Sequence, residues 1–180
     1  LYMYIIENGE KKIAQKAIFE FAKSLEKKSF IDTNKLPISE FMKNNSFFSS
    51  PFVKIKKSDS NLMHRAIAIY DSLSTSKIDL NSYYRLAEIQ FRALEDLDSA
   101  YRIYNEIYNQ SFNRDLKLKA LKRMVDVILA KGDLESGREI LNNQINNKIW
   151  NKNDKIELRM KQNQILFFES NLDFLYDDLS

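Results

Sequence analysis

The chain has 180 residues, of which 44% are hydrophobic and 29% charged, and its 28 basic and 25 acidic side chains give a net charge of +3. This composition is typical of a folded chain, and so small a net charge argues against a strongly cationic nucleic-acid binder. The absence of cysteine excludes disulfides and sulfur-bound metals, and three glycines with two prolines leave few sites for the tight turns of a β-protein. We therefore expect an all-α fold.

No apolar run approaches the roughly 20 residues that a membrane-spanning helix needs. We expect a soluble chain, and the composition leaves open whether it is cytoplasmic or periplasmic. The sequence begins at Leu1 without methionine, and its last residues have the pattern of a helix interior. An excerpt from a longer protein is the interpretation that we favour.

Residues 1–27 predict a partial helix hairpin with its turn at Asn8 and Gly9. The spacing from Gly9 to Ala14 is the same as that from Gly132 to Gly137 further along the chain. We therefore expect the chain to open inside a repeat.

Residues 28–61 do not continue the helical pattern and predict an irregular, partly helical insertion. A first helix with Ser50 as its cap and Pro51 at its first position is the alternative. The aromatic side chains Phe47, Phe48 and Phe52 are compatible with a hook for a partner or with packing against a neighbouring apolar face.

From residue 62 onward, apolar residues recur at spacings of three and four, as in amphipathic helices. The pattern predicts a second helix at 62–76, a hairpin at 80–110, a hairpin at 115–147 and a truncated hairpin at 153–180 with its turn at Glu169 to Asn171. Leu97 and Leu134 are 37 residues apart, as are Ser99 and Ser136. Such self-similarity predicts an α-solenoid of stacked antiparallel hairpins.

A period of 34 to 37 residues resembles that of the tetratricopeptide repeat family. The resemblance rests on Tyr84, Ala87, Glu88, Phe91, Ala100 and Tyr104, with Gly132 as a helix stop and Gly137 at the position of Ala100. It implies that the small residues Ala100 and Gly137 lie where two helices approach most closely. Glu88 and Val125 replace the small residue of the family pattern, and the closing proline is absent.

Little in the sequence indicates catalysis. His64 is the only histidine, and it has no serine, acid or second ligand at motif spacing, so we expect an exposed or capping role. Zinc sites need several histidine or cysteine ligands, and no glycine-rich phosphate-binding motif occurs. We expect no enzymatic activity, no metal and no cofactor.

In tetratricopeptide-like hairpins the first helix of each repeat lines a concave wall. The resemblance places Arg85, Ile89, Arg92, Lys119, Lys122 and Asp126 on that wall. Four basic groups facing one groove would favour an acidic peptide or a chain-terminal carboxylate, through charge-assisted hydrogen bonds and faster encounter. A solvated face whose charges only maintain solubility is the alternative.

The function that we expect is that of a non-enzymatic scaffold or adaptor, which presents a helical groove to a protein or peptide, with no small-molecule cofactor. One alternative is a helical-repeat RNA-binding protein, which the modest net charge disfavours. Another is an accessory helical domain of a multidomain enzyme.

Overall fold

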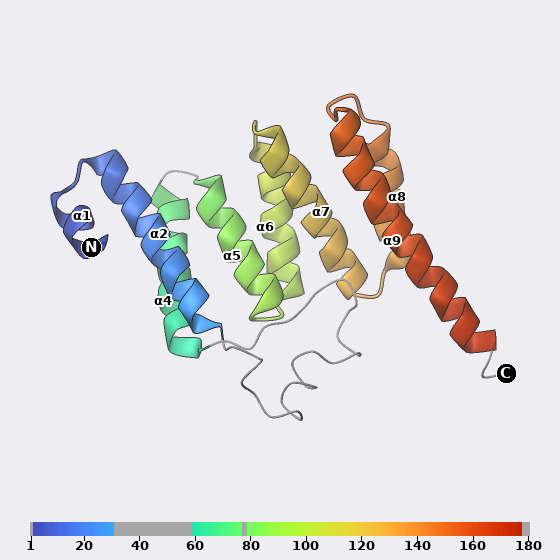
Figure 1. The fold of residues 1–180 in the computed structure, drawn as a ribbon, viewed down its shortest axis with the longest axis horizontal. Coiled ribbons are helices and arrows are strands. Elements are labelled where there is room, and N and C mark those ends of the chain that lie inside the picture. The colour runs from blue at the N-terminus through green and yellow to red at the C-terminus, as the bar shows by residue number, and fades with distance from the viewer. Residues whose placement is uncertain (1, 31–58, 77–78, 178–180) are drawn as a thin grey trace.

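The computed structural model of the chain describes residues 2–30, 59–76 and 79–177, without the side chains of 76, 167, 168 and 170–177. These residues form α-helices and no β-strand, which confirms the predicted all-α fold (Figure 1). The helices are α1 (Tyr2–Asn8), α2 (Lys11–Ser29), α4 (Ser60–Ser76), α5 (Leu80–Arg92), α6 (Leu97–Gln110), α7 (Arg114–Ala130), α8 (Leu134–Ile145) and α9 (Lys152–Asp177). None of the helices described here is long and apolar enough to cross a membrane.

The helices form two layers (Figure 1). Helices α2, α5, α7 and α9 make up the layer nearer the viewer, called the first layer below, and α4, α6 and α8 lie behind them as the second layer. From α2 onward, each helix packs against the next helix along the chain, so the chain alternates between the layers. The two cavities described below both lie in the first layer.

Three hydrophobic clusters hold the layers together, and each combines two helices of one hairpin with the first-layer helix of the next. The clusters unite α2 with α4 and α5, α5 with α6 and α7, and α7 with α8 and α9. Helix α5 contributes Ile89 to one cluster and Phe91 to the next. Since each hairpin shares its core with a neighbour, no hairpin buries its apolar surface alone.

Most of the residues in the predicted repeat pattern are buried where helices meet. Ala87, Phe91, Ala100 and Tyr104 lie in one cluster, and Tyr84 packs against it half-buried. A Cβ atom on Gly137 would come within 2.8 Å of the Leu129 side chain, so α8 approaches α7 closely at this glycine. The small residues among them, Ala87, Ala100 and Gly137, allow the helices to pack tightly.

Acidic or amide side chains start four of the helices. Asp79, Asp96, Asn113 and Asp133 each accept a hydrogen bond from a backbone N–H in the first turn of α5, α6, α7 and α8. Such N-caps satisfy donors that the helix itself leaves unpaired. The α5–α6 and α7–α8 turns both contain a residue with positive φ, Glu95 at 58° and Gly132 at 86°.

The structure corrects the predicted role of the helix after Gly9. The spacing shared with Gly132 and Gly137 matches α2 with α8, the second helix of a hairpin, but α2 lies in the first layer and pairs with α4. The predicted 28–61 insertion therefore falls between the two helices of one hairpin, where the backbone N–H of Asp59 donates to the carbonyl of Ser29 at 2.6 Å. Residues 31–58, with Phe47, Phe48 and Phe52, lie outside the described residues.

The predicted turn at Glu169 to Asn171 is wrong, because α9 continues through these residues as one helix from Lys152 to Asp177. No glycine or proline interrupts this stretch. Serine and asparagine inside a helix each cost only roughly 0.5 kcal/mol relative to alanine, which does not end a helix. A cap-like sequence without a helix breaker before it was therefore a weak signal.

Candidate functional site

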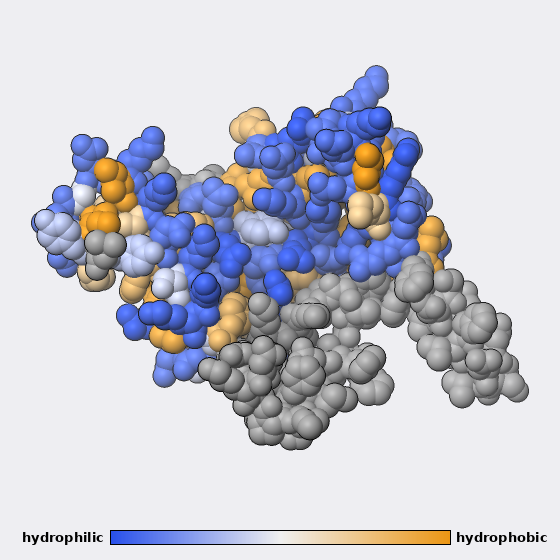
Figure 2. All heavy atoms as spheres, in the orientation of Figure 1, coloured by the Kyte–Doolittle hydropathy of each residue, from blue (hydrophilic) through white to orange (hydrophobic). Residues whose placement is uncertain are grey.

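The four basic residues predicted to face a groove all belong to the first layer, Arg85 and Arg92 on α5 and Lys119 and Lys122 on α7. Figure 2 shows that hydrophilic side chains predominate on this face, with apolar side chains scattered among them. The environment of each charge decides which of them can meet a partner.

Two residues of the predicted groove are not accessible. Ile89 is fully buried, in the cluster that contains Ala22 and Tyr70. Asp126 is also buried, and its carboxylate pairs with Arg123 at 3.0 Å and with Lys161 of α9. Both predictions are corrected, since these side chains are buried against other parts of the chain and are not exposed at the surface.

A repeated ion pair joins each first-layer helix to the next. Glu26 of α2 pairs with Arg85 of α5, Glu88 of α5 with Arg123 of α7, and Asp126 of α7 with Lys161 of α9. We call these three pairs the ion-pair ladder. The three acids are buried, with only 4%, 8% and 6% of their side-chain surfaces exposed. Removing the partner of a charge buried to this degree is strongly destabilising, so the ladder has a structural role.

Tyrosine hydroxyls from the second layer complete two steps of the ladder. Tyr70 donates to Glu26 at 3.0 Å, and Tyr104 donates to Glu88 at 2.7 Å. Burial and the neighbouring carboxylate raise the pKa of both tyrosines well above the ordinary value. Tyr84 lies beside the same Glu88, and burial followed by this charge raises its pKa to about 12. All three hydroxyls therefore stay protonated at neutral pH and can donate.

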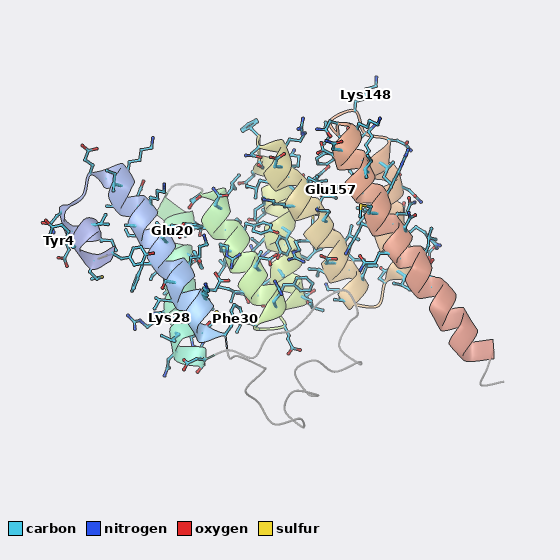
Figure 3. All side chains as sticks on the ribbon, viewed as in Figure 1. Tyr4, Glu20, Lys28, Phe30, Lys148 and Glu157 are labelled. Atoms are coloured by element: carbon cyan, nitrogen blue, oxygen red, sulfur yellow. The ribbon has the colours of Figure 1, made fainter. Side chains whose placement is uncertain are left out.

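Most of the predicted groove cations are already paired within the chain. Besides Arg85, Arg92 lies 3.6 Å from Glu88, and Lys122 lies 2.5 Å from Glu157. Figure 3 labels Glu157 in the region between α7 and α9. Lys119 is exposed and has no carboxylate partner among the described residues. Of the four predicted cations, Lys119 alone is thus available to a ligand without breaking an ion pair in the described part of the chain.

Two cavities adjoin along the first layer, with volumes of about 630 Å³ and 700 Å³. Tyr84 and Lys119 line both of them. The first, which we call the basic pocket, lies where α2, α5 and α7 meet, and Leu73 of α4 also lines it. The second lies between α7 and α9, with Lys122 and Met160 in its wall. Together they form a path across the first layer.

Sequence reasoning missed the part of this path that α2 provides. Lys16, Phe19 and Lys23 line the basic pocket, but the spacing from Gly9 to Ala14 matches α2 with a second-layer helix. A signal was present, because a basic residue precedes an acidic one by three positions in "KSLE" (23–26), "RLAE" (85–88) and "RMVD" (123–126). Three of the four first-layer helices, α2, α5 and α7, share this pattern.

The described residues contain no group of three or more histidine, cysteine, aspartate or glutamate side chains that could hold a metal ion. His64 is exposed, in the first turns of α4. Comparison with known protein families, curated proteins and solved structures finds no match for this chain.

Proposed function

We propose that this chain is a non-enzymatic scaffold, a solenoid of tetratricopeptide-like hairpins, that holds a peptide or an extended segment of a partner protein across its first layer. The observation that carries the proposal is the pair of adjoining cavities that share Tyr84 and Lys119. A ligand that occupies both must pass over α5 and α7, which suits an extended chain better than a compact metabolite.

The ion-pair ladder supports this function by fixing the spacing of the first-layer helices. Glu26, Glu88 and Asp126 each bind a cation of the following first-layer helix. A wall whose helices are held in this way is preorganised, so a partner loses less free energy in ordering it.

A protein partner fits this wall better than RNA. An RNA-binding face needs free cations in a row to neutralise phosphates. Here Arg85, Arg92 and Lys122 are engaged with carboxylates of the same chain. A phosphate backbone would have to compete with these carboxylates at each step.

Site-specific photo-crosslinking tests the proposal. A photoreactive residue would replace Met160, which is 66% exposed in the wall of the second cavity, or Lys119. The matched control places the same group at Asn109, an exposed residue on α6 of the second layer. In lysate of the source organism, we expect the two first-layer positions to crosslink one shared protein that Asn109 does not. Crosslinks that are equal at all three positions, or that disappear with nuclease, would contradict a protein-binding first layer.

A further inference from the structure

We propose that the basic pocket binds an internal segment of an acidic linear peptide, whose bulky apolar side chain enters the pocket while flanking carboxylates reach its lysines. This inference rests on the scaffold function proposed above and names the chemistry of the partner. It depends on three properties of the pocket, namely its free charges, its apolar floor and its rim of amides.

The charges around the basic pocket are unbalanced. Four cationic side chains line it, those of Lys16, Lys23, Arg85 and Lys119, and the lining contains the single carboxylate of Asp79. The charge of Arg85 is balanced by the buried Glu26, which leaves three lysines against Asp79. Asp79 caps α5, and its two oxygens accept from the Asn81 backbone N–H at 3.1 Å and the Ser82 hydroxyl at 2.6 Å. The pocket therefore presents net positive charge to a ligand.

At least two of these cations are available. Lys16 and Lys119 are exposed, stand on different helices and have no carboxylate partner within the described ranges. Lys23 pairs only with Glu20, at 3.5 Å and with both side chains exposed, and such a pair contributes little to stability. Carboxylates of a ligand can bind these lysines without disturbing the ion-pair ladder.

Half-buried apolar side chains provide the floor of the pocket. Phe19 packs its ring edge-on against Tyr70, with centroids 5.8 Å apart, and Tyr84 packs in the same way against Tyr104 at 5.5 Å. Leu73 and Leu116 complete this floor. Because the rings are held by buried neighbours, the floor is preformed and suits an aromatic or branched aliphatic side chain.

Two side-chain amides at the rim, those of Gln15 and Asn81, are exposed. Each amide offers both a donor and an acceptor, which are the groups that pair with the N–H and C=O of an extended main chain. A peptide therefore satisfies the rim, the floor and the lysines together.

Two other occupants fit less well. The chain's own 31–58 segment contains five lysines against Asp32 and Glu40, so its charge has the same sign as that of the pocket. A nucleic acid would need an exposed ring face for base stacking, whereas Phe19 and Tyr84 are half-buried and packed.

The test is selection from a phage-displayed library of random peptides with the whole chain as bait, followed by fluorescence polarisation with the enriched peptide. The pocket variant carries Lys16→Glu and Lys119→Glu. The matched control carries Lys28→Glu and Lys148→Glu, the same charge change at two exposed lysines that line neither cavity (Figure 3). Circular dichroism would check that both variants fold. We expect them to fold, because the substituted lysines are exposed.

We expect enriched peptides to share an aromatic or aliphatic residue flanked by Asp or Glu. The pocket variant should lose about tenfold or more in affinity, since hydrogen bonds to charged groups are removed, and the control should change less than about twofold. Replacing the acidic residues by their amides, or the apolar residue by serine, should cause a similar loss. An amidated C-terminus should leave affinity unchanged, because the segment is internal.

Several results would overturn the inference: no enrichment, a shared sequence without acidic residues, equal losses in both variants, or displacement by a single-stranded oligonucleotide at equimolar amounts. Peptide binding seen only after 31–58 is replaced by a short linker would identify that segment as the occupant instead. If crosslinking at Met160 and Lys119 still captures a protein in any of these cases, the scaffold function stands and only the peptide chemistry fails.

Discussion

The carboxylate of Glu88 on α5 accepts hydrogen bonds from the guanidinium of Arg123 on α7, at 2.6 Å and 3.1 Å. The same carboxylate accepts from the Tyr104 hydroxyl of α6 at 2.7 Å. One buried acid therefore connects three helices and both layers. The resemblance to the tetratricopeptide repeat family predicts a small residue at this position, whereas Glu88 has a structural function here.

Glu88→Gln should destabilise the fold by about 2–3 kcal/mol, because Arg123 and the hydroxyl of Tyr104 lose a charged partner in a buried setting. Urea denaturation followed by circular dichroism measures the change. Glu157→Gln is the control, since its pair with Lys122 is exposed, with 32% and 49% of the side-chain surfaces accessible. Such surface pairs contribute about 0–1 kcal/mol. Equal losses in the two variants would show that the ion-pair ladder does not stabilise the structure.

The α5–α6 and α7–α8 turns offer a matched pair of substitutions. Glu95 has φ 58° and Gly132 has φ 86°, a region that costs a residue with a side chain about 1–2 kcal/mol. We expect Glu95→Gly to raise the free energy of unfolding by about 1 kcal/mol, and Gly132→Ala to lower it by about 1 kcal/mol. No atom lies within 4 Å of a Cβ added to Gly132, so a loss there reports backbone strain alone. Thermal denaturation would contradict this reasoning if both substitutions shifted the midpoint in the same direction.

The helices between residues 60 and 145 could be predicted from sequence because local signals coincide there. Asp96 and Asp133 cap α6 and α8, which start 37 residues apart, the offset between Leu97 and Leu134 in the sequence. Apolar periodicity, caps and a glycine stop act within a few residues of one another, so the sequence records them directly.

The ion pairs between neighbouring hairpins were harder to predict from the sequence. Glu88 corresponds to Asp126, 38 residues later, whereas the second helices repeat at 37, because the turn before Asp133 is one residue shorter than the turn before Asp96. A shift of one position rotates a side chain by about 100° around a helix. The sequence alignment therefore matched Glu88 with Val125, and it placed Asp126 on the open surface.

Tyr70, Tyr84 and Tyr104 should make the fold sensitive to alkali. Burial raises the pKa of all three, that of Tyr84 to about 12, whereas tyrosine in an unfolded chain ionises near pH 10. A raised folded-state pKa gives stability that is fully present below about pH 10 and is lost as the pH rises towards the folded value. Tyrosinate absorbance at 295 nm from these residues should appear together with loss of helical signal. Tyr104→Phe should reduce the slope of stability against pH above 10, and an unchanged slope would contradict the assignment.

Replacing residues 31–58 by a short Gly-Ser linker should leave the helical fold intact. The segment lies between Phe30 and Asp59 in the chain, and the backbone N–H of Asp59 donates to the carbonyl of Ser29 at 2.6 Å, so a few residues can join the two ends. A shorter connection lowers the entropic cost of closing the loop by about 0.6 kcal/mol for each halving of its length. We therefore expect a free energy of unfolding that is unchanged or higher by about 1 kcal/mol, measured by urea denaturation. The control deletes the same residues without a linker. In that variant Phe30 is joined directly to Asp59, although α2 and α4 run antiparallel in one hairpin and their ends need a turn. A linker variant that lost the α2–α4 cluster, seen as exposure of the buried Tyr70 to solvent, would show that the 31–58 segment is itself part of the core.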